Sequence, residues 1–122
     1  MSADLFNGRS VLVLEDEPII AMLIEQLLEE AGATVLSTST LAAAEDEIAH
    51  QVPDMAVLDV NIHGQTSYSI AAQLRTLGVP SIFASGYGVA AHPDEFVGVP
   101  TVSKPYDLAE VTAAMKRAIG QA

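Results

Sequence analysis

Residues 11–32 have the sequence VLVLEDEPIIAMLIEQLLEEAG, a short apolar run followed by a longer amphipathic segment. The run at residues 11–14 has the length and composition of a buried strand. Pro18 suits the first position of a helix, and Gly32 suits the position after its end. Between them, apolar residues recur at the spacing of one helix face: Ile20, Leu23, Leu27, Leu28 and Ala31. The stretch therefore predicts a buried strand followed directly by a helix.

The same alternation of strand and helix continues along the chain. Apolar runs predict further strands at residues 33–38, 55–60, 80–85 and 99–102. Helical periodicity follows the second and third strands, and a last helix starts at Asp107, which forms a variant of the capping box with Glu110. Between the fourth and fifth strands, glycines and Pro93 leave room only for a short helix at about residues 93–97. We expect this short helix to be mobile, because so few residues form a marginal helix.

Five strands that alternate with helices predict an α/β fold with a parallel sheet covered on both faces. We expect a single domain over residues 1–122, with its core at about residues 9–121. The expected architecture is flavodoxin-like and doubly wound, with strand order 2-1-3-4-5 and right-handed crossovers. In that order the first and third strands are central neighbours, so a site is expected at their carboxyl ends.

The composition excludes several classes of function. The chain has 16 acidic residues against 5 basic ones and a formal charge of −11, which leaves too few cations to bind nucleic acid. It has no cysteine, which excludes a disulfide framework, a thiolate zinc site and a cysteine nucleophile. The first residues hold only a short apolar run, so we expect no signal peptide, no membrane span and a cytoplasmic location.

Acidic residues follow two of the predicted strands. Glu15 and Asp16 come directly after the first strand, and Asp59 lies at the end of the third. Taken separately, such acids are explained by solvated turns or by the favourable position of an acid at a helix N-terminus. If the two strands are neighbours, the three carboxylates converge, and a cation or protonation must relieve their repulsion. Oxygen ligands without cysteine or paired histidine indicate Mg²⁺.

Two further polar residues are expected at the same edge of the sheet. Ser85 ends the fourth strand, and Lys104 follows the fifth. An ammonium and a hydroxyl that face a metal-bound aspartate form a receptacle for a phosphoryl group. This arrangement predicts that Asp59 is the nucleophile, that Lys104 and Mg²⁺ neutralise charge on the transferred group, and that Ser85 bonds a phosphoryl oxygen.

Four sequence elements carry a family resemblance: VLVLEDEP, LDVNIHG, FASGYG and SKP. In this order and spacing they resemble a response-regulator receiver domain over nearly the whole chain. The resemblance implies that Asp59 accepts a phosphoryl group from a histidine kinase or a histidine phosphotransfer protein, in a two-component system or phosphorelay. It also implies a downstream protein partner. The receiver uses all residues, so we expect neither a DNA-binding nor an enzymatic output domain.

The resemblance also implies which residues hold the metal. Mg²⁺ is then bound by Asp16, by Asp59 and by the backbone carbonyl of Asn61. Glu15 acts mainly through water.

The remaining motif residues match the family with one departure. Ser85 corresponds to the switch hydroxyl of receivers and Lys104 to their invariant-type lysine, whose bond to Pro105 is typically cis. Many receivers place a tyrosine or phenylalanine three residues before that lysine, but this chain has Thr101. The usual coupling between hydroxyl and aromatic ring is therefore not expected here.

A finer resemblance lies in PSIFASGYG, residues 80–88. It is similar to the "FAT GUY" motif of alphaproteobacterial single-domain receivers linked to stress signalling. Ser81 replaces the phenylalanine of that motif, and Ser85 replaces its threonine. In receivers the position of Tyr87 lies at the mouth of the site, so we expect its ring to hinder water and to prolong the life of the aspartyl phosphate.

Other polar residues are not expected in the site. His63 follows Asp59 and is interpreted as a solvated loop residue, and His50 and His92 have no ligand partner at a suitable spacing. Asp54 lies five residues before Asp59, at the other end of the third strand. At about 3.3 Å per residue it is roughly 16 Å away, so it should not be phosphorylated.

Other classes of function require different residues at these positions. A haloacid-dehalogenase-like phosphatase carries its nucleophile in a D-x-D pattern after the first strand, where this chain has EDE at residues 15–17. A flavodoxin-like cofactor binder needs a phosphate cradle there, and acids would repel the phosphate. An unphosphorylated docking module would lack one of the four elements. The receiver itself is compatible with a stand-alone protein or with a fragment of a hybrid histidine kinase.

Overall fold

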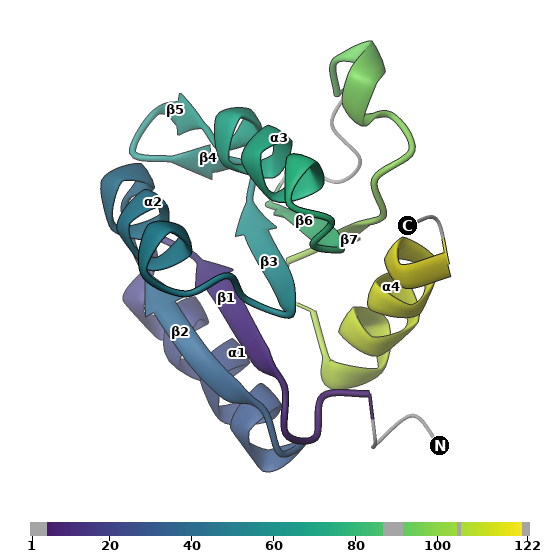
Figure 1. Ribbon diagram of the computed structural model, residues 1–122. Helices are drawn as coiled ribbons and strands as arrows, with labels where there is room; N and C mark the ends of the chain where they lie inside the picture. Colours follow the sequence, from purple (N-terminus) through teal and green to yellow (C-terminus); the bar gives the residue numbers. More distant parts are fainter. Residues whose placement is uncertain (1–4, 87–91, 105, 121–122) are drawn as a thin grey trace.

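The structure, a computed structural model, describes residues 5–86, 92–104 and 106–120 (Figure 1). The elements of the described residues are β1 (Ser10–Leu14), α1 (Pro18–Glu30), β2 (Thr34–Thr38), α2 (Leu41–His50), β3 (Met55–Asp59), β4 (Asn61–Ile62), β5 (Gln65–Thr66), α3 (Tyr68–Thr76), β6 (Ser81–Ser85), the short 3₁₀ helix η2 (Asp94–Phe96), β7 (Thr101–Ser103) and α4 (Leu108–Gly120). In this part of the chain, no helix is both long and apolar enough to cross a membrane.

The main sheet has the strand order β2-β1-β3-β6-β7, and all of its described pairs are parallel. Counted along the sheet-forming strands, this is the predicted order 2-1-3-4-5, which is confirmed. β4 and β5 form a separate antiparallel hairpin. The strand order reverses between β1 and β3, and the crevice at their carboxyl ends is the place where open α/β sheets bind ligands.

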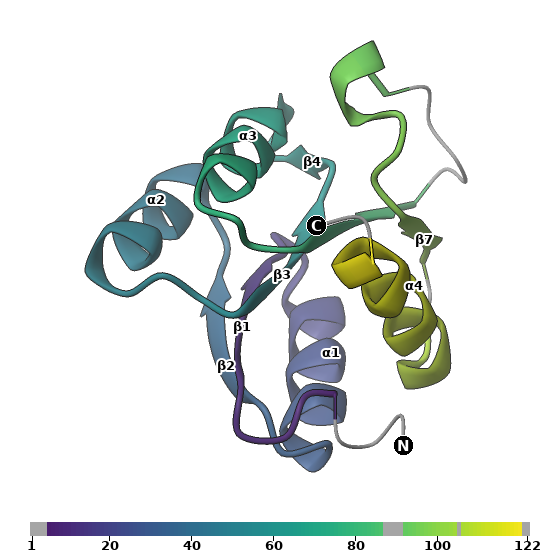
Figure 2. The same cartoon turned by 45° about the vertical axis from the view of Figure 1, so that its right-hand side comes forward.

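Two helical layers cover the sheet, and each layer buries one of its faces. Figure 2 shows α1 and α4 on one side of the sheet and α2 and α3 on the other. Alternate strand residues supply the two cores: Val11 and Val13 pack with the first pair of helices, and Leu12 and Leu14 with the second. Because both faces are buried, the strands are nearly continuous apolar runs, as the sequence shows.

The core face of α1 differs from the predicted one in two positions, because Ile24 was not predicted to be buried and Leu23 was. Ile24 and Leu28 are fully buried, whereas Leu23 is 44% exposed. A helix turns by about 100° per residue, which places Leu23 at the edge of the stripe that Ile24 and Leu28 define. The prediction that Leu23 faces the core was therefore wrong.

Local sequence signals explain several helix ends. Pro18 occupies the first turn of α1, and Gly32 follows its end with φ +94°, where a Cβ atom would collide with the side chain of Asn7. The Asp107 carboxylate accepts the backbone N–H of Glu110 at 2.8 Å and caps α4, as predicted.

The connection from β6 to β7 contains little helix in its described residues. η2 has three residues, which agrees with the short helix that the sequence predicted; its mobility stays a prediction. β7 begins at Thr101, two residues later than predicted, because Pro100 has no N–H to offer the sheet. The Pro100 carbonyl still accepts the N–H of Phe83 at 3.0 Å.

Candidate functional site

Three carboxylates meet at the carboxyl ends of β1 and β3. Glu15 and Asp16 directly follow β1, and Asp59 is the last residue of β3, which pairs with β1. One carboxylate oxygen of each residue lies within 4.8 Å of the others. The structure therefore brings these three residues together, as the strand order predicted. We call Glu15, Asp16 and Asp59 the acidic cluster.

Lys104 forms ion pairs with two members of the acidic cluster. Its Nζ atom lies 2.7 Å from Asp59 Oδ2 and 2.8 Å from Glu15 Oε1. Burial by itself would lower the pKa of Lys104, but the bonds to Asp59 and Glu15 outweigh it and raise that pKa above its usual value. The Lys104 side chain is 9% exposed. It is therefore a fixed ammonium beside the Asp59 carboxylate.

Glu15 is the most deeply buried member of the acidic cluster. It is 2% exposed, and burial raises its pKa to about 7, although the Lys104 bond and the Glu17 N–H act in the opposite direction. That N–H donates to Glu15 Oε2 at 3.1 Å. The charge of Asp59 adds to the rise of the Glu15 pKa. One ammonium thus does not balance three carboxyl groups, and the cluster favours further positive charge.

The β4–β5 hairpin donates backbone N–H groups to the acidic cluster. Its turn residues His63 and Gly64 have φ of 50° and 81°, which is typical of a type I′ turn. In such a hairpin the residues that flank the turn exchange backbone hydrogen bonds, and the next pair, Asn61 with Thr66, does not. The Asn61 N–H instead donates to Asp59 Oδ1 at 3.4 Å. The Asn61 carbonyl likewise takes no part in the hairpin ladder, which fits the expected role as a metal ligand.

Asp16 is held by the tip of this hairpin. The His63 N–H donates to Asp16 Oδ2 at 2.9 Å, and the His63 ring nitrogen Nδ1 lies 3.8 Å from the same oxygen. Burial would raise the pKa of Asp16, but the N–H bond and the charge of His63 outweigh it and lower that pKa. The His63 side chain is 61% exposed, so its interpretation as a solvated residue fits the ring but missed the backbone contact.

Ser85 lies at the same edge of the sheet, on the strand between those of Asp59 and Lys104. Ala84 pairs with Asp59 across β3 and β6, and Ser85 lies one residue further on. The Ser85 carbonyl accepts the Lys104 N–H at 2.9 Å. Ser85 is buried, at the carboxyl end of β6 beside the crevice.

The donor set suits a small, hard divalent cation. The acidic cluster offers carboxylate oxygens that can converge on one ion. That the Asn61 carbonyl is a further ligand stays a prediction. Oxygen-only ligands at a partly open edge are typical of magnesium sites in proteins. The cluster could therefore bind a metal ion.

Other residues named in the sequence analysis lie elsewhere. Asp54 accepts the Ser10 N–H at 2.8 Å, at the edge where β1 begins, and not at the acidic cluster. His92, which sequence reasoning set aside, bridges Tyr68 and Thr101. No sequence signal marks this bridge, because its partners are 24 and 9 residues away without a common period.

Tyr87 and Pro105 lie outside the residues that the structure describes. The expectations for the Tyr87 ring and for the cis bond before Pro105 stay predictions.

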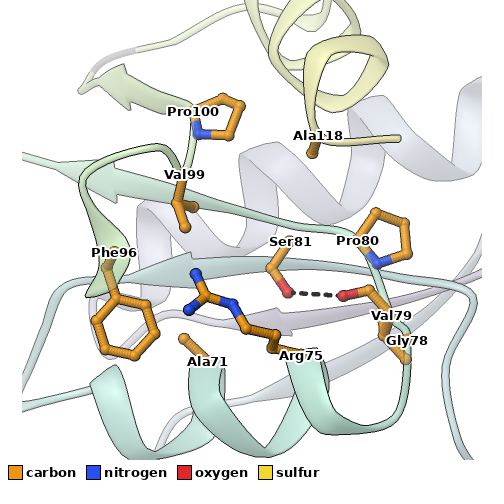
Figure 3. Close-up of a pocket in the computed structure, with 10 residues that line it drawn as sticks. All are labelled: Ala71, Arg75, Gly78, Val79, Pro80, Ser81, Phe96, Val99, Pro100 and Ala118. Atoms are coloured by element: carbon orange, nitrogen blue, oxygen red, sulfur yellow. Dashed lines mark hydrogen bonds between the residues drawn. The ribbon is translucent and has the colours of Figure 1, made fainter. Parts of the chain in front are cut away.

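A cavity of about 480 Å³ lies away from the acidic cluster (Figure 3). Gly78, Val79 and Pro80 line it, so it opens beside the start of β6, at the edge of the sheet opposite the carboxylates. Arg75 and Phe96 form another wall. The chemistry of the acidic cluster is therefore not located in this cavity.

Known proteins resemble this chain over most of its length. The family model of the response regulator receiver domain matches residues 11–116. The phyllosphere-induced regulator PhyR of Methylorubrum extorquens is 28% identical over 129 residues, with 98% of this chain and 46% of that protein covered. The phosphate regulon transcriptional regulatory protein PhoB of Pseudomonas aeruginosa is 26% identical over 116 residues, with 89% and 51% covered. The chain thus spans about half the length of these curated relatives.

Among solved structures, SdrG from Sphingomonas melonis Fr1 is similar to the chain over its own full length. It superposes with a TM-score of 0.79 at 30% identity, and 98% of this chain and 99% of SdrG are covered. The family match over residues 11–116 includes the acidic cluster, Ser85 and Lys104. The chain therefore belongs to the response regulator receiver domain family.

Proposed function

We propose that this chain is a phosphoacceptor switch, in which Asp59 takes a phosphoryl group from a phosphohistidine donor in the presence of Mg²⁺. The observation that carries the proposal is the Asp59 carboxylate, 6% exposed, with Lys104 Nζ at 2.7 Å and two further acids beside it. A buried carboxylate beside an ammonium and two further acids that could hold a metal ion is suited to attack phosphorus, because the charge that develops would be neutralised.

The transfer exchanges one bond to phosphorus for another. An Asp59 oxygen bonds to phosphorus while the P–N bond to the donor imidazole breaks, and the electron pair of that bond returns to the nitrogen. Lys104 is positioned to hydrogen-bond a phosphoryl oxygen, and the Ser85 hydroxyl to bond another. These contacts hold the phosphorylated state once it has formed.

Asp16, Asp59 and the Asn61 carbonyl would hold Mg²⁺, with Glu15 acting through water. When bound, the ion neutralises charge on the transferred group. The ion would also offset the repulsion within the acidic cluster. Burial is the main cause that raises the pKa of Glu15, and the charge of Asp59 adds to it.

The donor is proposed to be a histidine kinase or a histidine phosphotransfer protein that docks beside α1. The donor histidine must reach Asp59, so its protein has to cover the elements that rim the crevice. α1 begins at this rim and presents Ile19 and Met22, which are 82% and 70% exposed. Large apolar side chains at such exposure suit a protein partner better than water.

The consequence of phosphorylation is proposed to be a change in protein contacts, so we propose a signalling protein and not an enzyme. The likeness to the PhyR stress response regulator supports a place in stress signalling, and we propose a protein as the downstream partner.

Mass spectrometry after incubation with acetyl phosphate and Mg²⁺ tests the proposal. One phosphoryl group is expected on the unmodified chain and none on Asp59→Asn. Asp54→Asn is the matched control, because Asp54 lies on the same stretch of chain at the opposite edge of the sheet and should leave labelling intact. Labelling of Asp59→Asn, or labelling that EDTA leaves undiminished, would contradict the proposal.

A further inference from the structure

A chain of side-chain hydrogen bonds joins α3 to β7 outside the acidic cluster. Tyr68 Oη lies 2.8 Å from His92 Nδ1, and His92 Nε2 lies 2.9 Å from Thr101 Oγ1. The Thr101 hydroxyl donates to the Val99 carbonyl at 3.3 Å. Thr101 therefore accepts from His92 Nε2–H, and His92 Nδ1 accepts from the Tyr68 hydroxyl. We call Tyr68, His92 and Thr101 the histidine relay. With the imidazole neutral, each hydroxyl or ring hydrogen in the relay is donated to one hydrogen bond.

Aromatic rings enclose the relay. The His92 ring centroid lies 4.8 Å from that of Phe83, and Tyr68 stacks on Phe96 at 5.2 Å. Phe83 and Phe96 are at most 2% exposed. The relay is thus packed against the core, and a small displacement of His92 would disturb several ring contacts at once.

The surroundings favour the neutral ring. Burial lowers the pKa of His92. From α3, Tyr68 is the titratable group that faces it, and Arg75 lies over the Phe96 ring instead, 4.9 Å from its centroid. η2 contributes Asp94 and Glu95, both exposed, and β6 and β7 contribute the uncharged Phe83 and Thr101.

Each member of the relay is connected to a different residue of the candidate phosphorylation site. Tyr68 follows Ser67, whose N–H bonds the carbonyl of Val60, the residue after Asp59. Thr101 lies on β7, three residues before Lys104. His92 comes seven residues after Ser85 in the sequence. The relay thus joins the three chain segments that carry Asp59, Lys104 and Ser85.

We propose that His92 is a positioning residue that couples this site to α3 and β7, in the place of the aromatic side chain that position 101 lacks. The histidine relay holds the unphosphorylated arrangement, and a phosphoryl group on Asp59 breaks it. This inference rests on the phosphoacceptor function proposed above.

The direction of the coupling follows from the contacts. A phosphoryl group would draw Ser85 and Lys104 toward its oxygens, whereas Lys104 here bonds Asp59 and Glu15. We infer that this shift at the ends of β6 and β7 disturbs the bond between His92 and Thr101, because a hydrogen bond weakens steeply once its geometry is lost. Release of His92 would then alter the surface formed by η2 and β7.

Beryllofluoride, a phosphoryl analogue, tests the inference when it is added with Mg²⁺ to the full chain. Fluorine NMR measures its affinity, and a proton NMR titration measures the pKa of His92, with the His50 signal as internal control. Analogue binding is expected to raise the pKa of His92 toward its ordinary value. Coupling between sites is reciprocal, so Tyr68→Phe and Thr101→Val should each bind the analogue about 5-fold more tightly or better.

Tyr68→Phe removes the hydroxyl and keeps the ring, and Thr101→Val replaces the hydroxyl with a methyl group of similar size. Thr76→Val is the matched control, because the Thr76 hydroxyl bonds the Ala72 carbonyl within α3 and has no link to the relay. Analogue binding with an unchanged His92 pKa, or with equal or weaker affinity in the hydroxyl variants, overturns the inference and leaves the phosphoacceptor function standing. If the unmodified chain does not bind the analogue at all, both proposals fail.

Discussion

Lys104 Nζ lies 2.7 Å from Asp59 Oδ2, although the two residues are 45 positions apart in the sequence. β3 and β7 are not neighbours, because β6 lies between them. The lysine therefore reaches the aspartate across the end of an intervening strand, from the loop after β7. The stability of the folded protein and the proposed phosphoryl transfer therefore both depend on Lys104 and Asp59.

Replacement of Lys104 by glutamine is expected to destabilise the metal-free protein. The change leaves buried carboxylates without their ammonium, and the loss of one partner of a buried pair typically costs about 3–5 kcal/mol. Urea unfolding with and without Mg²⁺ measures the effect, and the ion should recover part of the loss. Arg9→Gln, at an exposed residue before β1, is the control and should change stability by less than about 0.5 kcal/mol. Equal effects of the two variants would contradict the prediction.

Without metal, the free energy of unfolding should fall as the pH rises from about 4.5 to about 7, through the contribution of Glu15. The pKa of Glu15 is raised in the folded protein, so its stabilisation is complete below the unfolded pKa and is lost as the pH approaches the folded pKa. The loss is on the order of 3 kcal/mol, at about 1.4 kcal/mol per pKa unit.

Denaturant unfolding of the unmodified chain and of Glu15→Gln over this pH range measures that contribution as a difference. His92 acts with the opposite sign, because its pKa is lowered and its stabilisation is lost as the pH falls. Because both proteins contain His92, its contribution cancels in the difference between their free energies of unfolding. A difference that does not vary with pH would contradict the assignment to Glu15.

Mg²⁺ is expected to stabilise the folded chain, because the acidic cluster exists only when β1 and β3 are paired. At an ion concentration about 100-fold above Kd, the gain is roughly 2.7 kcal/mol. Thermal unfolding at increasing Mg²⁺ measures it. Asp16→Asn should reduce the gain, whereas Asp54→Asn, bonded to Ser10 at the other edge, should preserve it. A melting temperature that does not change with millimolar Mg²⁺ would count against the metal site.

Ile19→Ser and Met22→Ser should slow phosphoryl transfer from a phosphohistidine protein and leave labelling by acetyl phosphate unchanged. A small donor reaches Asp59 without covering α1, whereas a protein donor must pack on it. Val52→Ser is the control, because Val52 is half exposed but precedes β3 at the opposite edge of the sheet. The docking assignment is wrong if both donors are slowed equally or if neither is.

Gly32→Ala should destabilise the fold more than Gly78→Ala. Both glycines have positive φ, 94° and 76°, and a side chain in that region costs about 1–2 kcal/mol. Only at Gly32, of the two, would a Cβ atom also collide with Asn7. Chemical denaturation of the two variants measures the difference. Equal losses of stability would show that the contact with Asn7 adjusts without cost.

Much of the fold could be predicted because its signals are local. The period of apolar residues separates strands from helices within a few positions, and Pro18 and Asp107 mark helix starts through their own backbone chemistry. Local signals were weaker where the period is ambiguous: Leu23 fits the predicted stripe of α1 but lies at its edge. The β4–β5 hairpin was not predicted, although His63-Gly64 offers a glycine at the turn.

The sequence by itself determined the strand and helix pattern, the carboxyl-end position of Glu15, Asp16 and Asp59, and the chemistry that such residues can perform. These properties depend on neighbours along the chain and on the general rule that parallel strands share one carboxyl edge.

Only the tertiary structure decided that Lys104 bonds two carboxylates at once and that His92 joins Tyr68 to Thr101. Such contacts depend on the distance between segments that are brought together by sheet register and by the packing of buried rings. Hydrogen bonds form only within a few tenths of an ångström of the right geometry, and no local pattern of residues encodes that distance.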